Sequence, residues 1–361
     1  MRLIDVNTAS LTEVFIGDTT WPTYTALSYV WGADQKLKLS TQNKITLALP
    51  GSLHGTAAKT IDDAIYLTSL LGIQYIWVDA LCIVQDDDSD KSQQIGNMST
   101  IYANALLTII AAGGVNADAG LPGVRAPRLP IQREVLVKCH DQGDCPSIKL
   151  LTTLNPKPAS FDYVLDKTIW ATRGWTLQER AVSNRALIFT DNEVLWACKK
   201  TCWREETFLE TSLVRTSWFS LHESDTVLVS SLRRFYVTNE PTEQIWYKFQ
   251  SLVLNYTQRN LTNEGDASDA FGAIVQQVRQ LLAEDFVWAL PASRFELGLC
   301  WEPYRQGLLR RNCLTTLETT SLRRRVGFPS WSWLGWRGAI SLRIEDRHTE
   351  LGYALLSISV E

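Results

Sequence analysis

Alternating strand-like and helix-like segments between residues 24 and 114 constrain the fold of this chain more than any other feature. Three short apolar runs have the composition of buried strands, and they lie at residues 24–31, 75–78 and 106–112. Two stretches with apolar residues at helical spacing separate them, at residues 56–71 and from residue 90 onward. This order favours a parallel sheet with right-handed crossovers. We therefore expect an α/β fold with a mostly parallel sheet flanked by helices.

The composition of the chain changes after residue 114. Residues 115–168 carry many Gly, Pro and Asp residues and predict an insertion with irregular structure. A helix is expected at residues 170–183. The apolar runs ALIFT and VLWAC, separated by Asp191 and Asn192, then indicate a β-hairpin.

The C-terminal half predicts a mixed α+β region. Two amphipathic helices are expected, at residues 243–258 and 268–283, and the chain is aromatic and strand-like from Phe286 onward. The expected division is a first region at 1–200, with its core at about 20–200, and a C-terminal extension at 201–361. We expect the extension to pack on the first region.

Charge, hydropathy and cysteine usage exclude several classes of function. The net charge of −4 and the pI of about 5.7 argue against a nucleic-acid partner, because such proteins usually carry a basic domain or stripe. The sequence has no run of about 18 apolar residues and no apolar signal segment at its start, so we expect no membrane association. Seven scattered cysteines favour reduced thiols in the cytoplasm. Cys198 and Cys202 have zinc-ligand spacing but lack a matching second pair, so we expect no metal site.

The carboxyl ends of the predicted strands form the candidate functional site, because open parallel sheets bind ligands there. Trp31, Gly32 and Asp34 follow the first strand. The indole could stack on a flat ring and the glycine could let backbone approach a phosphate; alternatively, Trp31 is a core residue and Gly32 only a turn residue. Asp79 follows the second strand and is expected either to act as an acid, base or ribose-hydroxyl acceptor or to cap the next turn.

An acidic run, Asp86 to Asp88 with Asp90, precedes the second predicted helix. Carboxylates that converge from a rigid loop can bind a metal ion, but favourable charge at a helix N-terminus is the simpler account. Asp90 and Gln93 have the spacing of a capping box at that N-terminus.

The segment RGWTLQER holds a second candidate acid, Glu179. Two interpretations stay open: a buried Arg–Glu pair that fixes this helix on the sheet, and a catalytic glutamate. The sequence contains no G-x-S-x-G elbow, P-loop or G-x-G-x-x-G motif, and none of its four histidines lies in a motif. A Ser–His–Asp hydrolase therefore has no support.

These segments resemble the heterokaryon-incompatibility (HET) domain of fungal proteins. TALSYVWG resembles the first HET motif, the stretch from IWVDALCIVQ to LLTIIAAGG the second, and RGWTLQERAVSNRALIF the third. YTQRNLTNEGDASDAFGAI and PSWSWLGW resemble segments that commonly follow the domain. The resemblance covers most of the chain in the family's order. Five motif residues are expected to be structural: Tyr102, Arg173, Trp175, Gln178 and Arg180.

The resemblance implies a role in fungal non-self recognition, in which the fusion of unlike cells triggers cell death. HET domains also distantly resemble TIR domains, which are flavodoxin-like units, and some TIR domains cleave NAD. The resemblance implies a TIR-like core with a nucleotide-facing loop at residues 31–34. It also implies that Cys82, Gln85 and Gln93 face the ligand.

The sequence departs from the TIR pattern at the catalytic acid. The position of the TIR glutamate falls near Gln93, and no glutamate lies between Asp79 and Gly114. A neutral amide cannot stabilise an oxocarbenium-like transition state as a carboxylate can. NAD cleavage therefore requires Asp79, Asp90 or Glu179 to take that role.

Three functional hypotheses stay open at this point. The chain could be a death-inducing signalling domain that acts through homo-oligomerisation or a partner protein. It could be a TIR-type hydrolase that uses NAD as its substrate and needs no bound cofactor. It could also be a stand-alone HET-family protein recruited to small-molecule metabolism.

Overall fold

The computed structural model describes residues 1–15, 21–33, 35, 37–128, 134–137, 148–151, 161–198, 202–205, 241–304, 322–342 and 344. An eight-stranded sheet dominates this part of the chain, with the strand order β10-β9-β8-β5-β3-β4-β1-β2. Its strands are β1 Arg2–Asp5, β2 Ser10–Glu13, β3 Tyr24–Ser28, β4 Tyr75–Val78, β5 Leu107–Ala111, β8 Arg185–Phe189, β9 Val194–Cys198 and β10 Cys202–Arg204.

The four central strands are parallel, in the order β4-β3-β5-β8. All five residues of β3 and all five of β5 are buried, as expected for strands covered on both faces. The strand–helix alternation seen in the sequence therefore forms the predicted parallel core. The registers Leu27↔Val78 and Ser28↔Ile110 bring the carboxyl ends of three strands to one edge.

Both margins of the sheet are antiparallel, which makes the whole sheet mixed. The predicted hairpin of β8 and β9 is confirmed, and β10 extends it. At the other margin, β1 pairs with β4 and with β2. The N-terminal hairpin was not predicted, because it consists of two four-residue strands with little alternation between apolar and polar residues.

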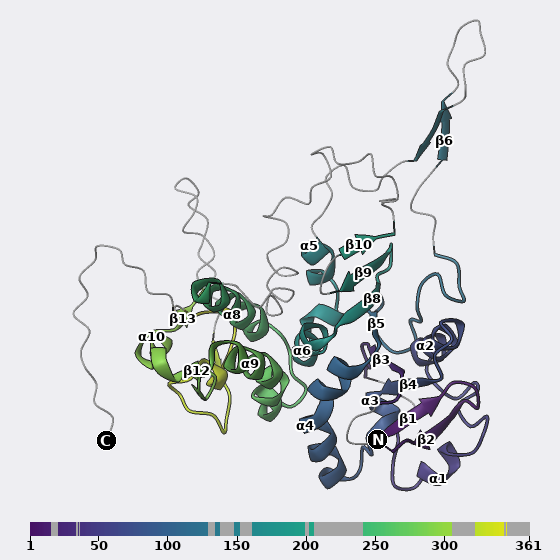
Figure 1. Ribbon diagram of the computed structural model, residues 1–361, viewed down its shortest axis with the longest axis horizontal. Coiled ribbons are helices and arrows are strands. Elements are labelled where there is room, and N and C mark those ends of the chain that lie inside the picture. The colour runs from purple at the N-terminus through teal and green to yellow at the C-terminus, as the bar shows by residue number, and fades with distance from the viewer. Residues whose placement is uncertain are drawn as a thin grey trace, which may run out of the picture.

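Helices cover both faces of the sheet (Figure 1). Helix α2 (Lys59–Leu70) lies on one face, and α4 (Asp88–Asn104) and α6 (Gly174–Val182) lie on the other. Two single-turn helices join this framework, α1 (Lys44–Leu47) and α3 (Asp79–Cys82). The fold is therefore α/β with a large mixed sheet between helical layers, as predicted at that level.

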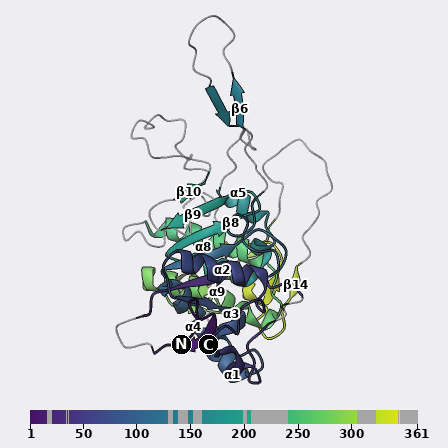
Figure 2. The ribbon, with the colours of Figure 1, turned by 90° about the vertical axis from the view of Figure 1, so that its right-hand side faces the viewer.

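Two C-terminal helices, α8 (Thr242–Thr257) and α9 (Asp269–Leu282), form a further layer outside α6. Figure 2 shows α2 in front of the strands and both C-terminal helices behind them. The buried residues Leu177 and Ala181 of α6 belong to the same hydrophobic cluster as α8 and α9. Helix α6 thus packs against the C-terminal helices as well as against the sheet.

The remaining elements are short. Residues 115–168 are not irregular throughout, because they include the hairpin of β6 (Glu134–Val137) and β7 (Ile148–Leu151) and the helix α5 (Phe161–Asp166). Three-residue and four-residue 3-10 helices occur at η1 Trp170–Thr172, η3 Glu264–Ala267, η4 Ala292–Arg294 and η5 Trp333–Gly335. After α9 the chain forms α10 Phe295–Leu299 and the two-residue strands β11 Phe286–Val287, β12 Leu290–Pro291, β13 Glu302–Pro303, β14 Arg323–Arg324, β15 Trp336–Arg337 and β16 Ile340–Ser341. Within the ranges given above, no helix is long and apolar enough to cross a membrane.

Candidate functional site

A group of polar side chains meets where the central strands end. We call it the carboxylate cluster, and it comprises Ser28, Tyr29, Trp31, Asp79, Tyr102, Arg173 and Glu179. Ser28 is the last residue of β3, Asp79 directly follows β4, and Glu179 lies on α6. The β3–β4 crossover and the β5–β8 crossover leave this edge in opposite directions, so the cluster lies at a topological switch point of the sheet.

Glu179 is the buried acid of the cluster. The residue is only 5% exposed, and its Oε2 accepts a short hydrogen bond from the Ser28 hydroxyl. The Trp170 indole donates in turn to Ser28 Oγ at 2.8 Å. Burial raises the pKa of Glu179 to about 7, with a further rise from the negative charge of Asp79 and an opposing effect from Ser28. The carboxyl group therefore exchanges its proton near neutral pH.

Asp79 is the more accessible acid, since it is only partly buried. Its Oδ2 accepts from the Trp31 indole at 2.9 Å, and its Oδ1 accepts from the Ala80 N–H at 2.7 Å. Burial raises the pKa of Asp79 to about 6, and the positive charge of Arg173 opposes that rise. Asp79 thus accepts from the backbone N–H of the next residue, Ala80, and belongs to the cluster. Its expected role as an acid, base or ribose-hydroxyl acceptor stays a prediction.

Arg173 and Tyr29 complete the cluster. The guanidinium group donates from Nη1 to the Tyr29 carbonyl at 2.7 Å, which ties the start of α6 to the end of β3. Tyr29 is 3% exposed, and its hydroxyl finds no hydrogen-bond partner among the described residues. Burial and the nearby negative charge of Asp79 raise the pKa of Tyr29, which keeps the hydroxyl a donor. A buried donor without an acceptor is costly, so it marks a place for a water molecule or a ligand.

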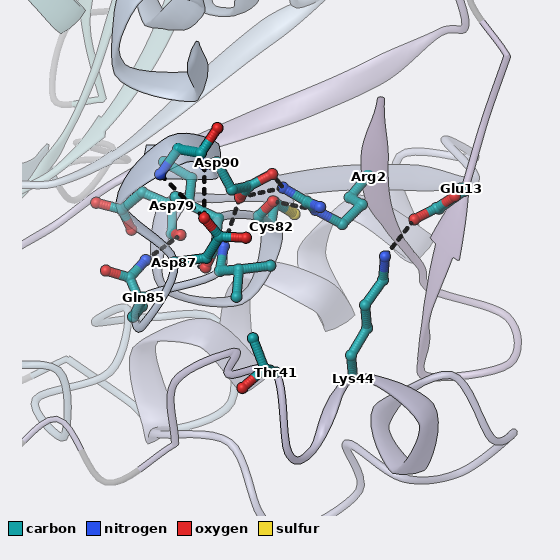
Figure 3. A network of polar contacts seen from close by, with 12 residues as sticks. Arg2, Glu13, Thr41, Lys44, Asp79, Cys82, Gln85, Asp87 and Asp90 are labelled. Atoms are coloured by element: carbon teal, nitrogen blue, oxygen red, sulfur yellow. Dashed lines mark hydrogen bonds and ion pairs between the residues drawn. The ribbon is translucent and has the colours of Figure 1, made fainter. Parts of the chain in front are cut away.

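A second network of polar contacts holds the turn that carries Asp79 (Figure 3). Arg2 donates to the Cys82 carbonyl at 2.7 Å and forms a short ion pair with Asp90. Asp90 also accepts from the Val84 N–H at 2.8 Å, and the Gln85 side chain donates to the Asp79 carbonyl at 3.2 Å. These contacts fix α3 and the following loop against β1, and Asp79 with them.

The acidic run before α4 is structural, as its simpler account predicted. Asp87 caps the helix by accepting from the N–H groups of Ser89 and Asp90, so the predicted Asp90–Gln93 capping box is wrong. The carboxylate of Asp90 is turned away from that role by its contacts with Arg2 and Val84. Asp86 accepts from the backbone and hydroxyl of Thr41. No group of three or more His, Cys, Asp or Glu residues suited to a metal ion occurs in the described ranges.

The other residues predicted to face a ligand differ in how exposed they are. Trp31 is partly buried, and the Lys38 ammonium lies 5.3 Å from its ring centroid. Cys82 is buried, and burial raises the pKa of its thiol to about 12. Gln93 is exposed on α4. Asp34 lies outside the described residues.

Gly32 allows two loops of the protein to pack closely. Its φ of +76° favours glycine, and a Cβ there would lie 2.6 Å from Asn116 Cβ in the loop after β5. The glycine therefore allows two loops at the strand ends to pack closely, which fits the turn-residue interpretation.

The third motif ties α6 to the sheet. The Glu179 carboxylate accepts from the Ser28 hydroxyl, Arg173 donates to the Tyr29 carbonyl oxygen, and the positive charge of Arg173 acts on Glu179. On the opposite side, Gln178 Oε1 accepts from the Ala273 N–H of α9 at 3.0 Å. Trp175 packs against both large hydrophobic clusters. Arg180 is partly buried, and its positive charge acts on Arg259.

Sequence reasoning missed Ser28, Tyr29 and Trp170 as members or supports of the site. Ser28 and Tyr29 stand in the first motif, TALSYVWG, at the carboxyl end of a buried strand. A hydroxyl residue that ends a buried strand needs a polar partner, and that signal was available. Trp170 offered no comparable signal.

The family model for heterokaryon incompatibility proteins (HET) matches residues 24–179, from the first residue of β3 to Glu179. The chain contains a HET domain over these residues. It is 33% identical over 106 residues to the heterokaryon incompatibility protein 6, OR allele, of Neurospora crassa. That match covers 27% of this chain and 15% of the relative. No solved structure matches the chain.

The residues of the carboxylate cluster all belong to the HET motifs. The three motifs, which are far apart in the sequence, supply every member of the carboxylate cluster. The first motif supplies Ser28, Tyr29 and Trp31; the second supplies Asp79 and Tyr102; the third supplies Arg173 and Glu179.

Proposed function

We propose that this HET-domain protein acts in fungal non-self recognition, and that its HET domain produces the response that leads to cell death. The family match and the Neurospora crassa relative support the biological role. The convergence of all three motifs on one buried cluster supports placing the response in the HET domain itself.

We further propose that the response is chemical: hydrolysis of the N-glycosidic bond of a nucleotide such as NAD. The observation that carries this proposal is the pair of acids, Asp79 and Glu179, with raised pKa values beside the Tyr29 hydroxyl, which has no hydrogen-bond partner in the described part of the chain. Strongly perturbed carboxyl groups with a specific charged partner are typical of catalytic sites.

The arrangement of the sheet supports a nucleotide substrate and a TIR-like fold. The parallel order β4-β3-β5-β8 corresponds to the first four strands of the flavodoxin-like order 2-1-3-4-5. Such sheets bind nucleotides outside the carboxyl ends of their strands at the switch point. The carboxylate cluster occupies that place in this protein.

The two acids take different roles in this proposal. Asp79, with a pKa of about 6, is mostly ionised at neutral pH and stabilises positive charge that develops on the ribose. The N-glycosidic bond breaks, and nicotinamide leaves as a neutral base. A water oxygen then bonds to the ribose carbon, and its proton passes to a carboxylate of the pair and then to solvent. Glu179, with a pKa of about 7, is suited to hold that proton.

Trp31 and Arg173 prepare the site for substrate. The Trp31 indole donates to Asp79 Oδ2, and the carboxylate keeps further lone pairs that can accept from a ribose hydroxyl. The charge of Arg173 keeps Asp79 ionised at neutral pH. No acid at Gln93 is needed, because the carboxylates come from the end of β4 and from α6.

The test is the release of nicotinamide from NAD by the purified chain. We expect release that Asp79→Asn abolishes and Glu179→Gln reduces at least tenfold, which corresponds to about 1.4 kcal/mol in the barrier. The matched controls are Asp86→Asn and Glu296→Gln, which alter carboxylates on exposed residues outside the cluster. Both should retain full release.

Full release by Asp79→Asn would contradict the assigned role. If the wild-type chain released no nicotinamide and instead assembled as its concentration rose, hydrolysis would be rejected in favour of signalling by self-association or partner contact.

A further inference from the structure

Arg259 is a buried cation at the junction between the C-terminal helices and α6. It is 5% exposed, and in the described part of the chain its guanidinium group donates to three neutral oxygens. These are Asn255 Oδ1 at 2.8 Å, the Arg173 carbonyl at 3.2 Å and Thr176 Oγ1 at 3.0 Å. A buried charge is costly to retain, and here burial lowers the pKa of the guanidinium group to about 9. We therefore expect a role for Arg259 at the junction between the C-terminal helices and α6.

The neighbours of Arg259 clamp the same turn through the backbone. The Asn260 N–H donates to the Thr172 carbonyl at 2.6 Å, and the Gly174 N–H donates to the Asn260 carbonyl at 2.7 Å. A Cβ on Gly174 would lie 2.5 Å from Leu261 Cδ2, so a larger residue there would require the Leu261 side chain to shift. Residues 259–261 therefore enclose the turn from which the Arg173 side chain extends.

Arg173 is the cation of the carboxylate cluster. We infer that Arg259 is a positioning residue, which holds the backbone of Arg173 so that the C-terminal helices set where that charge lies beside Asp79 and Glu179. The consequence for catalysis rests on the proposed function, whereas the positioning itself does not. The C-terminal helices thereby become a means of controlling the HET-domain site.

The charges around Arg259 allow this role to be separated from a purely electrostatic one. Arg259 interacts with the charges of Arg180, Asp166 and Glu179. The pKa of Asp79 is lowered by Arg173, and Arg259 is not among the groups that shift it. Titration of Asp79 therefore reports the position of Arg173, and it does so in the absence of NAD.

The test measures the pKa of Asp79 by ¹³C-carboxyl NMR, with Asp79→Asn used to assign the signal. Arg259→Lys keeps the charge but loses the planar fork that reaches several oxygens. We expect it to raise the pKa of Asp79 by about half a pH unit or more. In an Arg173→Gln background the same substitution should cause no further rise. Asn255→Ala, which removes one acceptor without touching the cation, should raise that pKa in the same direction.

The matched control is Arg325→Lys, because Arg325 is equally buried among the C-terminal elements but bonds to Glu264 and to carbonyls of η5 and β15. It should leave the pKa of Asp79 unchanged. An unchanged Asp79 pKa in Arg259→Lys and Asn255→Ala, with a rise in Arg173→Gln, would overturn the inference. An equal rise in Arg325→Lys would also overturn it. Absence of nicotinamide release bears only on the proposed function, since this readout contains no substrate.

Discussion

Replacing Glu179 by Gln should make the protein more stable than the wild type at alkaline pH and not at acidic pH. Gln keeps the size of the side chain and an oxygen that accepts from Ser28, but it cannot ionise. The wild-type carboxyl group has a pKa raised from 4.5 to about 7, so the folded protein favours its protonated form. The stability that this group contributes is complete below pH 4.5 and is lost as the pH rises through 7.

The size of the effect follows from that pKa. At about 1.4 kcal/mol for each pH unit, the wild-type protein loses about 3 kcal/mol from this group between acidic and alkaline pH. The Gln variant loses none of it. The difference in unfolding free energy between the variant and the wild type should therefore grow by about 3 kcal/mol from pH 4.5 to about pH 8.

Urea denaturation at both pH values measures this difference directly. Titrating groups that do not interact with Glu179 are common to the two proteins and cancel in the comparison. The control, Glu296→Gln, alters an exposed carboxyl group, and its difference from the wild type should stay constant with pH. A constant difference for Glu179→Gln as well, or one that shrinks as the pH rises, would refute the assignment of Glu179 as a buried acid whose pKa is raised in the folded protein.

Three further predictions concern the surroundings of the cluster. Trp31→Phe removes the indole donor that lowers the pKa of Asp79, so that pKa should rise above about 6 in a ¹³C-carboxyl NMR titration. Gly32→Ala should destabilise the protein by about 1–3 kcal/mol more than Gly55→Ala does in urea denaturation. Both glycines have positive φ, but only the first is crowded by a neighbouring loop. Asp87→Ala removes the α4 cap and should cost about 1 kcal/mol, whereas Asp88→Asn, which alters another carboxylate of the same helical turn, should cost less; an equal cost for the two would contradict the assignment of Asp87.

The parallel core could be predicted because its signals are local. Each central strand is a continuous apolar run bounded by a turn, and each crossover helix has apolar residues at helical spacing. The hairpin β1–β2 escaped prediction because its stability depends on pairing with β4, about 70 residues away. The N-terminus of α4 was misplaced for a related reason: Asp90 has the spacing of a cap, but Arg2 engages it from a distant strand.

The site could be predicted only in part. Asp79 and Trp31 were placed at the strand edge because each directly follows a buried run. The entry of Glu179 into the cluster depends on how α6 lies across β3, which the Ser28 and Arg173 bonds determine and which no spacing within the helix reveals. The support from Arg259 comes from a segment about 80 residues farther along the chain.

The central claim is that three distant motifs build one site in which Asp79 and Glu179 act on each other. The most direct measurement is a ¹³C-carboxyl NMR titration of Glu179 in the wild type and in Asp79→Asn. The negative charge of Asp79 contributes to the raised pKa of Glu179, so removing that charge should lower the pKa from about 7. An unchanged pKa of Glu179 in the variant would show that the two acids titrate independently, and it would contradict the account.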